Sequence, residues 1–400
     1  MLSALICFIA ASAAAAATPP VECRRVAWGA ESGLLVSVDA GTVVLLQDGR
    51  RTSHPLDAFR DLVLAPVSEP PLPPPLTVWT AGGHRLAVRR VRTEPAPGGA
   101  LTLLGYGWRA EGMPLGSLRG LATRAALQAP AEDRRAFEAA MADPPTGHDL
   151  LRAERGPHGQ VLACTVEALG EDGVELTIGG GRRRSLGWDA VGWIVLGPVG
   201  DRAPAPVHRV LLADGTAVPL DAFELRGGRL SGLGAGARWT IEAARLARVR
   251  VASERHRCLS DLQPARVATT PLLDVVWPPR FDASVAGPPL RMGGEAFSTG
   301  IGMHVRTEME FAPDGDYTHL CALVGVDDAA GASGAVVFRV EADGRAVFRS
   351  DALHGGDAPI AVTADIAGAR RVTLIAESAD PTALSGQFAD WAEARFVRAP

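Results

Sequence analysis

The middle of this 400-residue chain contains the same segment twice. Residues 41–66 and residues 173–198 align without a gap, and ten of the 26 aligned positions are identical. The identical residues include the first glycine, a Gly-Arg-Arg sequence in the middle and the last proline of each segment. A repeated pattern of this kind predicts that one local fold occurs twice in the chain.

The repeat extends beyond these segments. Residues 98–102 (GGALT) match residues 227–231 (GGRLS) at nearly the same spacing from the first match. We therefore expect two copies of one small β-rich unit, over residues 24–123 and residues 160–252. Two copies are too few for a solenoid, which needs at least three stacked repeats.

Turn signals between apolar runs indicate that these copies consist of β-strands. Asp48-Gly49 and Asp172-Gly173 each lie next to alternating apolar residues, which is a strong signal for a hairpin. The chain contains 45 glycines and 30 prolines, a composition that favours short strands and tight turns over long helices. Each copy is therefore expected to form a small antiparallel sheet or barrel.

The segment between the copies, residues 124–159, is predicted to be a short helical insert or linker. Pro130–Asp143 begins with a proline and two acidic residues, places apolar side chains on one face, and is followed by two prolines. These features are the start and stop signals of a helix. Ser117–Leu127 is a second helical candidate.

The last third of the chain has the pattern of an antiparallel β-sandwich. Apolar runs alternate there with turns that contain glycine or aspartate. The expected strands are Tyr317–Val326, Ala335–Ala342, Arg345–Ser350, Ile360–Ile366, Arg371–Glu377 and Trp391–Val397. Six or more such strands with almost no helix predict two packed sheets of jelly-roll type. The fold class expected for the whole chain is therefore all-β.

The charge of the chain limits the class of partner. The net charge is −5, and neither sign forms a long block. A nucleic-acid-binding protein normally has a strongly basic face, so nucleic acid is not an expected partner. Short arginine clusters such as Arg182-Arg183-Arg184 fit solvated turns and strand edges.

The N-terminus has the pattern of a secretory signal peptide over residues 1–17. Residues 2–17 are almost entirely apolar and end in a run of alanines, followed by Thr18-Pro19-Pro20. This length is short for a membrane span and suits cleavage near Ala17. Because no Lys or Arg precedes the run, an uncleaved anchor is the alternative. We expect an exported protein (periplasmic, cell-surface or secreted) without a transmembrane span in the mature chain.

Removal of the signal peptide would leave four cysteines, Cys23, Cys164, Cys258 and Cys321. They are far apart and form no Cys-x-x-Cys sequence, which gives no support for a zinc site or a redox dithiol. In an exported protein some of them could pair as disulfides. Isolated buried thiols are the alternative.

Six short motifs occur in order between residues 254 and 398. They are Leu259–Leu262, Leu290–Gly294, Gly300–His304, Val324–Asp328, Val337–Val340 with the following Asp343-Gly344, and Asp390–Arg395. Together they resemble the NPCBM family of carbohydrate-binding modules. Modules of this family are attached to glycoside hydrolases and also occur in exported bacterial proteins.

The resemblance implies a galactose-binding-like β-sandwich over residues 254–398 that holds sugars in loops at one end. The partner that it implies is a polysaccharide or another glycan. Three positions depart from the family pattern. Cys258 stands where an aromatic residue is frequent, Met303 replaces a Thr or Ser before the motif histidine, and Glu393 replaces an aspartate.

The polar and aromatic motif residues are the candidate sugar-binding residues: His304, Asp327, Asp328, Asp390 and Trp391. His304 could bind a sugar hydroxyl, or it could be a core histidine that locks the glycine turn. Asp327 and Asp328 follow a buried strand, where they could bind hydroxyls or a structural calcium ion, or cap the next turn. Trp391 could stack on a sugar ring or fill the core.

The sequence contains no recognisable catalytic motif. A nucleophile elbow, a phosphate loop, a His-Glu-x-x-His zinc site and a dinucleotide fingerprint are all missing. Asp390 and Glu393 are three residues apart, which does not by itself make the carboxylate pair of a glycosidase. We expect a non-catalytic carbohydrate-binding protein. The alternatives are a glycan-active hydrolase with an unrecognised site in the duplicated region, and a structural or protein-interaction scaffold.

Overall fold

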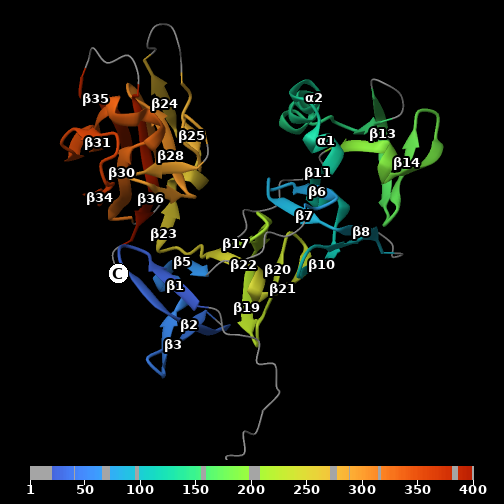
Figure 1. The fold of residues 1–400 in the computed structure, drawn as a ribbon, viewed down its shortest axis with the longest axis horizontal. Helices are drawn as coiled ribbons and strands as arrows, with labels where there is room; N and C mark the ends of the chain where they lie inside the picture. Colours follow the sequence, from blue (N-terminus) through green and yellow to red (C-terminus); the bar gives the residue numbers. More distant parts are fainter. Residues whose placement is uncertain are drawn as a thin grey trace, which may run out of the picture. The chain divides into compact units, whose positions relative to one another are not determined.

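A computed structural model describes residues 20–39, 41–64, 73–94, 99–154, 159–197, 208–270, 277–287, 289–313, 317–380 and 386–398. The predicted signal peptide lies outside these residues. The chain divides into two regions (Figure 1). We call residues 20–25 and 29–251 the module region, and residues 26–28 and 252–398 the sandwich. Both regions consist mainly of antiparallel sheets, so the predicted all-β fold class is confirmed.

The described residues of the module region form four modules of the same connectivity. In module 1 the first strand pairs with the second and the last, while the third pairs with the second and the fourth. A 3₁₀ turn precedes the last strand. The elements of module 1 are β1 (Pro20–Arg25), β2 (Ala30–Asp39), β3 (Thr42–Gln47), β4 (Arg50–Pro55), η1 (Leu56–Ala58) and β5 (Phe59–Leu64).

The other three modules repeat this connectivity. Module 2 consists of β6 (Leu76–Thr80), β7 (Arg85–Val88), β8 (Arg90–Thr93), β9 (Leu101–Leu104), β10 (Trp108–Met113), η2 (Leu115–Ser117) and β11 (Leu118–Thr123). Module 3 consists of β12 (Asp149–Ala153), β13 (Gln160–Leu169), β14 (Gly173–Ile178), β15 (Arg182–Gly187), η3 (Trp188–Ala190) and β16 (Val191–Val195). Module 4 consists of β17 (His208–Leu212), β18 (Ala217–Leu220), β19 (Ala222–Arg226), β20 (Arg229–Gly234), β21 (Ala237–Glu242), η4 (Ala243–Arg245) and β22 (Leu246–Arg250).

The second strand of each module shows that one copy of the sequence repeat contains two modules. In modules 1 and 3 this strand is continuous over ten residues, as β2 and β13. In modules 2 and 4 it is divided into two strands, β7 with β8 and β18 with β19. The boundaries predicted for the two copies stay a prediction. However, β12 of module 3 lies in residues 124–159, which the sequence indicated as a helical insert.

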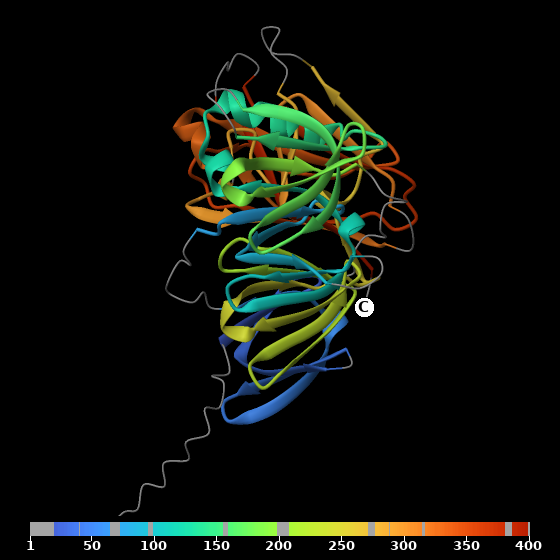
Figure 2. The same ribbon diagram turned by 90° about the vertical axis from the view of Figure 1, so that its right-hand side faces the viewer.

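Modules 1 and 4 join through their last strands, and modules 2 and 3 join in the same way. β5 pairs antiparallel with β22, with Leu62 opposite Val249. β11 pairs antiparallel with β16, with Leu121 opposite Ile194. Leu62 and Ile194 occupy the same position of the sequence repeat, and Val249 and Leu121 are both the fourth residue after a 3₁₀ turn. The two joins therefore have the same register. Figure 2 shows the sheets of this region from the side.

Two helices lie between β11 and β12. They are α1 (Arg124–Gln128) and α2 (Ala131–Ala142). α2 confirms the helix predicted over Pro130–Asp143, whereas most of the second candidate was wrong because residues 118–123 form β11. Within the described part of the chain, neither helix has the length and apolar character that a bilayer span requires.

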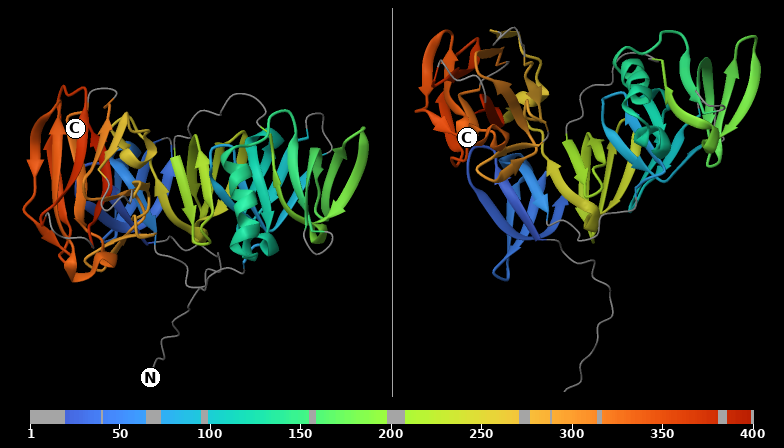
Figure 3. Two further views of the ribbon diagram at one scale, coloured as in Figure 1. Left: turned by 90° about the horizontal axis from the view of Figure 1, so that it is seen from above. Right: turned by 45° about the horizontal axis from the view of Figure 1, so that its top comes forward.

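The sandwich consists of two antiparallel sheets and a small hairpin (Figure 3). The first sheet has the order β25 (Arg280–Phe281), β28 (Gly300–His304), β36 (Phe388–Val397), β30 (His319–Val326) and β34 (Ile360–Asp365), and β23 (His256–Cys258) pairs with β36. The second has the order β24 (Arg266–Thr269), β29 (Thr307–Phe311), β35 (Val372–Ser378), β31 (Ala335–Ala342) and β32 (Arg345–Arg349), and β33 (Leu353–His354) pairs with β31. The hairpin is β26 (Leu290–Met292) with β27 (Glu295–Phe297). The strands predicted for this region are confirmed.

The central strand β36 is buried on both faces. Its inner face contributes Trp391 and Phe396 to the apolar core between the sheets. Ala392, on its outer face, packs against apolar residues of the β26–β27 hairpin. A strand covered on both sides carries few exposed positions, which explains the almost continuous burial from residue 389 to residue 397.

The cysteines after the predicted signal peptide, all of them among the described residues, are not joined in disulfides in this structure. Cys23, Cys164 and Cys321 are buried, as in the alternative that the sequence left open. Burial raises the pKa of the Cys23 and Cys164 thiols to about 12. Both are therefore protonated and unreactive near neutral pH.

Candidate functional site

Three strand ends of the first sandwich sheet bring most of the predicted site residues together. His304 ends β28, and Phe388, which begins β36, lies directly opposite it. Asp327 follows β30, and its backbone N–H donates to the Phe388 carbonyl at 3.1 Å. The motifs around His304, Asp327 and Asp390 are far apart in the sequence. The sheet order places them at one end of the sandwich.

His304 supports an exposed tryptophan at this end. The rings of His304 and Trp277 are stacked, with centroids 5.9 Å apart and planes 13° apart. Phe388 contacts the other two rings, each at a centroid distance of 6.0 Å. His304 is buried, whereas Trp277 is 38% exposed. We call Trp277, His304 and Phe388 the aromatic cluster.

The surroundings of His304 fix its protonation state. Burial lowers the pKa of His304, and the hydrogen bond to the Val305 carbonyl opposes this shift. Nδ1 lies 3.2 Å from that carbonyl oxygen, so the neutral ring carries its proton on Nδ1 and donates it there. Nε2 is then the hydrogen-bond acceptor of the ring.

The two adjacent aspartates hold the loops next to the aromatic cluster. Asp327 is buried and accepts the Ala329 N–H at 2.8 Å, as the N-cap of η6 (Asp328–Ser333). It also accepts the Arg291 N–H at 3.2 Å. Asp328 is half-buried and accepts the Gly294 N–H at 3.0 Å. Both carboxylates therefore attach the β26–β27 hairpin to the end of β30, and Asp327 caps the next turn.

Asp390 lies beneath the same hairpin. It is fully buried, on the outer face of β36 between Gly302 and Gly325. A side chain on either glycine would collide, since a Cβ would lie 2.5 Å from the Ala283 carbonyl oxygen or 2.9 Å from the sulfur of Met292. Gly302 therefore leaves room for the backbone of Ala283 and Ser284, and Gly325 leaves room for Met292 of the hairpin.

Asp390 is protonated near neutral pH. Burial raises the pKa of this carboxyl to about 9, assisted by a hydrogen bond with Asp327 and by the negative charge of Asp327. Neither oxygen of Asp390 has a close hydrogen-bond partner among the described residues, and the backbone N–H of Arg291 in the hairpin lowers the pKa too little to offset burial. As a carboxylic acid, Asp390 can donate its proton to Asp327.

Trp391 lies in the sandwich core. It is fully buried and meets Phe338 edge to face at a centroid distance of 5.3 Å. In this arrangement its ring offers no open face to a sugar, which agrees with the core-filling alternative. The described residues also contain no group of three or more His, Cys, Asp or Glu side chains placed to hold a metal ion. The structural calcium ion considered from the sequence stays a prediction.

Sequence reasoning missed the two aromatic partners of His304. Trp277 precedes Pro278-Pro279 and lies outside the motifs, and Phe388 lies two residues before the last motif. The two prolines that follow this tryptophan were the only local signal for the exposed ring. The contact between residues 277 and 304 depends on the fold.

A second buried site in the sandwich binds residues 26–28. Arg395, which is 1% exposed, donates from Nε to the Val26 carbonyl at 2.7 Å, and also donates to the Ala27 carbonyl. Its guanidinium lies 4.9 Å from the ring centre of Trp28, whose indole N–H donates to Thr363 at 2.8 Å. The arginine of the last motif is therefore structural, and it makes residues 26–28 part of the sandwich.

Comparison with known proteins places the sandwich in a family. Residues 255–397 match the model of the NPCBM/NEW2 domain. A protein of Renibacterium salmoninarum, named as an endo-alpha-N-acetylgalactosaminidase, is 31% identical over 116 residues. The match covers 28% of this chain and only 7% of that protein, so the chain spans a small part of the length of this relative.

Solved structures of carbohydrate-binding modules are also similar. One is the CBM51 of Clostridium perfringens GH95, solved in complex with methyl-galactose, which is 25% identical with a TM-score of 0.32. The match covers 36% of this chain and 99% of the CBM51 chain. The tandem CBM51 modules of Sp3GH98, the family 98 glycoside hydrolase of Streptococcus pneumoniae, are 11% identical with a TM-score of 0.32. They cover 81% of this chain and 88% of theirs.

Proposed function

Because residues 255–397 are an NPCBM/NEW2 domain, which is a carbohydrate-binding module, we propose that this chain is an exported, non-catalytic glycan-binding protein. The sugar binds at the end of the sandwich that carries the aromatic cluster. Trp277 is the platform on which one sugar ring stacks. His304, from a motif of the family, stacks against that platform. Asp328, which follows β30 at the same end of the sandwich, is the second polar partner.

The exposure of Trp277 is the observation that carries this proposal. A tryptophan ring that is 38% exposed keeps apolar surface in contact with water. The C–H face of a sugar ring can cover such a surface, because it is apolar while the hydroxyl groups at the ring edge stay solvated. The stack of Trp277 on buried His304 holds the platform in one orientation, so little conformational entropy is lost on binding.

The polar groups beside the platform suit hydroxyl recognition. The neutral His304 can accept a hydroxyl proton at Nε2, because Nδ1 is used by the Val305 carbonyl. Asp328 has one oxygen engaged by the Gly294 N–H, which leaves capacity on its carboxylate for a further donor. Asp327 and Asp390 are buried, so their part in binding is to hold the β26–β27 hairpin.

The affinity for a single sugar is expected to be modest. A shallow site with one stacking ring binds in the millimolar to micromolar range, which is about −4 to −8 kcal/mol. Retention on a polymer would then depend on several sites acting together.

The test is a glycan array with the full chain, followed by calorimetry of the best ligand. Glycans that end in N-acetylgalactosamine or galactose are the first probes, because the curated relative is named for the former. Trp277→Ala should weaken binding about tenfold to a hundredfold, the loss of one stacked ring at about 1.5 to 3 kcal/mol. Equal binding by wild type and variant would exclude the aromatic cluster as the site.

Phe281→Ala is the matched control. Phe281 is 40% exposed, and no ring contact joins it to His304 or Phe388 in the described part of the chain. Its removal should leave glycan affinity unchanged. If no glycan on the array binds the wild-type chain, the glycan-binding proposal itself fails.

Export has its own test. Expression of the full-length gene in a Gram-negative host, followed by N-terminal sequencing of the mature protein, should give a chain that begins near Thr18. A chain that keeps residues 1–17 and stays with the cytoplasmic fraction would contradict export.

A further inference from the structure

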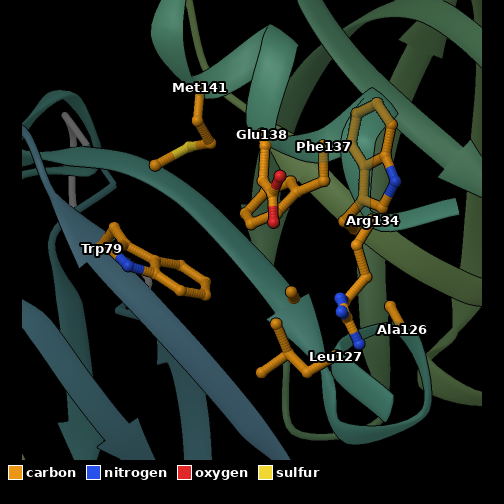
Figure 4. A pocket seen from close by; sticks show the side chains of 9 residues that line it. Trp79, Ala126, Leu127, Arg134, Phe137, Glu138 and Met141 are labelled. Atoms are coloured by element: carbon orange, nitrogen blue, oxygen red, sulfur yellow. The ribbon is translucent and has the colours of Figure 1, made fainter. Parts of the chain in front are cut away.

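A cavity of about 320 Å³ lies in the module region between the sheet and the two helices (Figure 4). It is far from the proposed sugar site in sequence and belongs to modules 2 and 3. The residues that line it are Trp79, Ala122, Ala126, Leu127, Arg134, Phe137, Glu138, Met141 and Trp193. The sheet contributes three of them, and α1 and α2 contribute the other six.

The register of the sheet explains why apolar side chains face the helices. Trp193 of β16 lies opposite Ala122 of β11, and Trp79 of β6 lies opposite Gly120 of β11. Residues directly opposite one another point to the same face, so these four positions share one face. Their neighbours Leu121 and Ile194 point to the other face, into the apolar core of the modules. The sheet is therefore apolar on both faces.

The equivalent join of modules 1 and 4 has the opposite character. Asp61 and Arg250 occupy there the positions of Trp193 and Ala122. Asp61 lies 3.3 Å from the Arg60 guanidinium and 4.0 Å from that of Arg248. Ion pairs thus occupy this face in one copy of the join, and an aromatic cavity occupies it in the other. The fold of the join does not require the cavity.

The two helices pack closely on the sheet, so the cavity does not result from poor packing between helices and sheet. A Cβ on Gly120 would lie 2.6 Å from the sulfur of Met141, so α2 packs directly on the sheet at this point. Arg119 donates to the Met141 carbonyl at 3.1 Å near the end of the same helix. Protein interiors have few voids larger than a water molecule, and this volume corresponds to about ten waters.

The lining defines the chemistry of a ligand. Phe137 lies between Trp79 and Trp193, at ring-centroid distances of 5.2 Å and 5.7 Å. Trp193 is 2% exposed, and among the described residues its indole N–H has no hydrogen-bond partner. Seven of the nine lining residues are apolar, so a sugar would lose hydration at most of its hydroxyl groups.

Two charged residues of α2 border the cavity. Figure 4 shows Arg134 and Glu138 reaching from the helix toward the space beside Trp79 and Leu127. Arg134 donates one N–H of Nη1 to the Ala129 carbonyl at 3.1 Å. A guanidinium has five N–H groups, so others can bind an anionic group at the opening.

We propose that this cavity binds a small amphipathic anion. Its apolar ring system, of about ten to fifteen non-hydrogen atoms by the volume available, lies among Trp79, Phe137 and Trp193. Its carboxylate lies at the opening beside Arg134. This site is independent of the sugar site in the sandwich.

Three probes with the same ring test the proposal: 1-naphthaleneacetate, 2-(1-naphthyl)ethanol and 2-(1-naphthyl)ethylamine. Each is titrated into the full chain by calorimetry at pH 7. We expect the acid to bind at least threefold more tightly than the alcohol, and the amine to bind least tightly. Equal affinity for the three would overturn the assignment of an anion, and tighter binding of the amine would assign the site to a cation beside Glu138.

Substitutions of the two charged residues should act in opposite directions. Arg134→Gln should weaken binding of the acid about fivefold and leave the alcohol unchanged, as expected for an exposed charge pair. Glu138→Gln should strengthen binding of the acid about twofold. The opposite pair of signs would contradict the proposal, and both side chains are exposed, so neither change should unfold the protein.

A variant that fills the cavity separates ligand binding from adsorption. Ala126 lines the cavity from α1 and is half-buried, so Ala126→Phe should abolish binding of all three probes. Ala139→Phe is the matched control, because Ala139 is exposed on α2 and does not line the cavity. If Ala126→Phe binds the acid as the wild type does, the probe is bound elsewhere and the proposal fails. Glycan binding is expected to be the same in all these variants.

Discussion

The sandwich and the module region each contain a sheet whose outer face is covered by another segment of the same region. The residues at these two contacts differ in chemistry. In the sandwich, the outer face of β36 carries Asp390 and Arg395, and their polar atoms face the β26–β27 hairpin and residues 26–28. In the module region, the outer face of β11 and β16 carries apolar groups under α1 and α2. Under the two helices a cavity of about 320 Å³ remains.

The difference shows what each kind of cover can do. Hydrogen bonds to buried polar groups have narrow distance and angle limits, so they fix a covering segment in one position. Apolar contacts are less directional, so a helix can rest on a sheet and still leave room for a ligand. The sandwich therefore uses its polar cover to build a rigid end for the aromatic cluster, and the modules use an apolar cover to form a cavity.

The largest effect that would test this comparison is the loss of Arg395. Arg395→Met removes the donor to three carbonyls, those of Val26, Ala27 and Glu393, and leaves them buried without that partner. We expect the free energy of unfolding of the sandwich to fall by about 3 to 5 kcal/mol. Urea denaturation of the full chain, followed by hydrogen exchange at β30 and β36, measures this change.

Trp28→Ala is the control for the same segment. It removes the ring over Arg395 and the hydrogen bond to Thr363 but leaves the guanidinium donors in place, so the loss should be about 1 to 2 kcal/mol. A loss for Arg395→Met no greater than for Trp28→Ala would mean that the polar cover contributes little.

The next effect concerns the dependence of stability on pH. The pKa of Asp390 is about 9 in the folded chain, against an ordinary value of 3.8. Between these values the folded chain binds a proton that the unfolded chain has released, so the free energy of unfolding falls as the pH rises through this window. One such group contributes a slope of at most about 1.4 kcal/mol per pH unit.

Asp390→Asn removes this contribution, because the amide stays neutral and can still donate to Asp327. The variant should be more stable than the wild type at pH 8, with a smaller advantage at pH 5. Urea midpoints at pH 5, 6.5 and 8 measure the difference. Parallel curves for the two proteins would show that Asp390 is already ionised in the fold.

The sequence predicted the elements whose cause is local. The helix over Pro130–Asp143 has its own start and stop signals, and the strands of the sandwich alternate with turn residues. The motifs also identified which family the sandwich belongs to, because their order is readable without contacts. These features depend on residues near one another in the chain, so no tertiary information was needed.

The sequence did not predict features that depend on which strands meet. Trp277 becomes part of a site only because His304 ends a neighbouring strand. Asp390 is protonated because the fold buries it next to Asp327. Residues 26–28 join the sandwich through Arg395, across more than 360 positions of sequence. The division of each sequence copy into two modules was hidden for the same reason, since strand pairing defines a module.

The smallest predicted effect tests how α2 is seated on the apolar sheet. Gly120 in the pair β11–β16 is equivalent to Arg248 in the pair β5–β22. The strand pairing itself therefore tolerates a long side chain at this position. Gly120→Ala should therefore cost only about 1 kcal/mol, and the cost should come from Met141, whose sulfur would lie 2.6 Å from the new Cβ. Met141→Ala alone should also cost about 1 kcal/mol, while the double variant should lose less than the sum, because the truncated Met141 makes room for the methyl group. If the losses measured by urea denaturation are additive, Met141 is not the group that opposes a side chain at residue 120. The Ile194 carbonyl oxygen, 3.0 Å from the same Cβ, would then be that group.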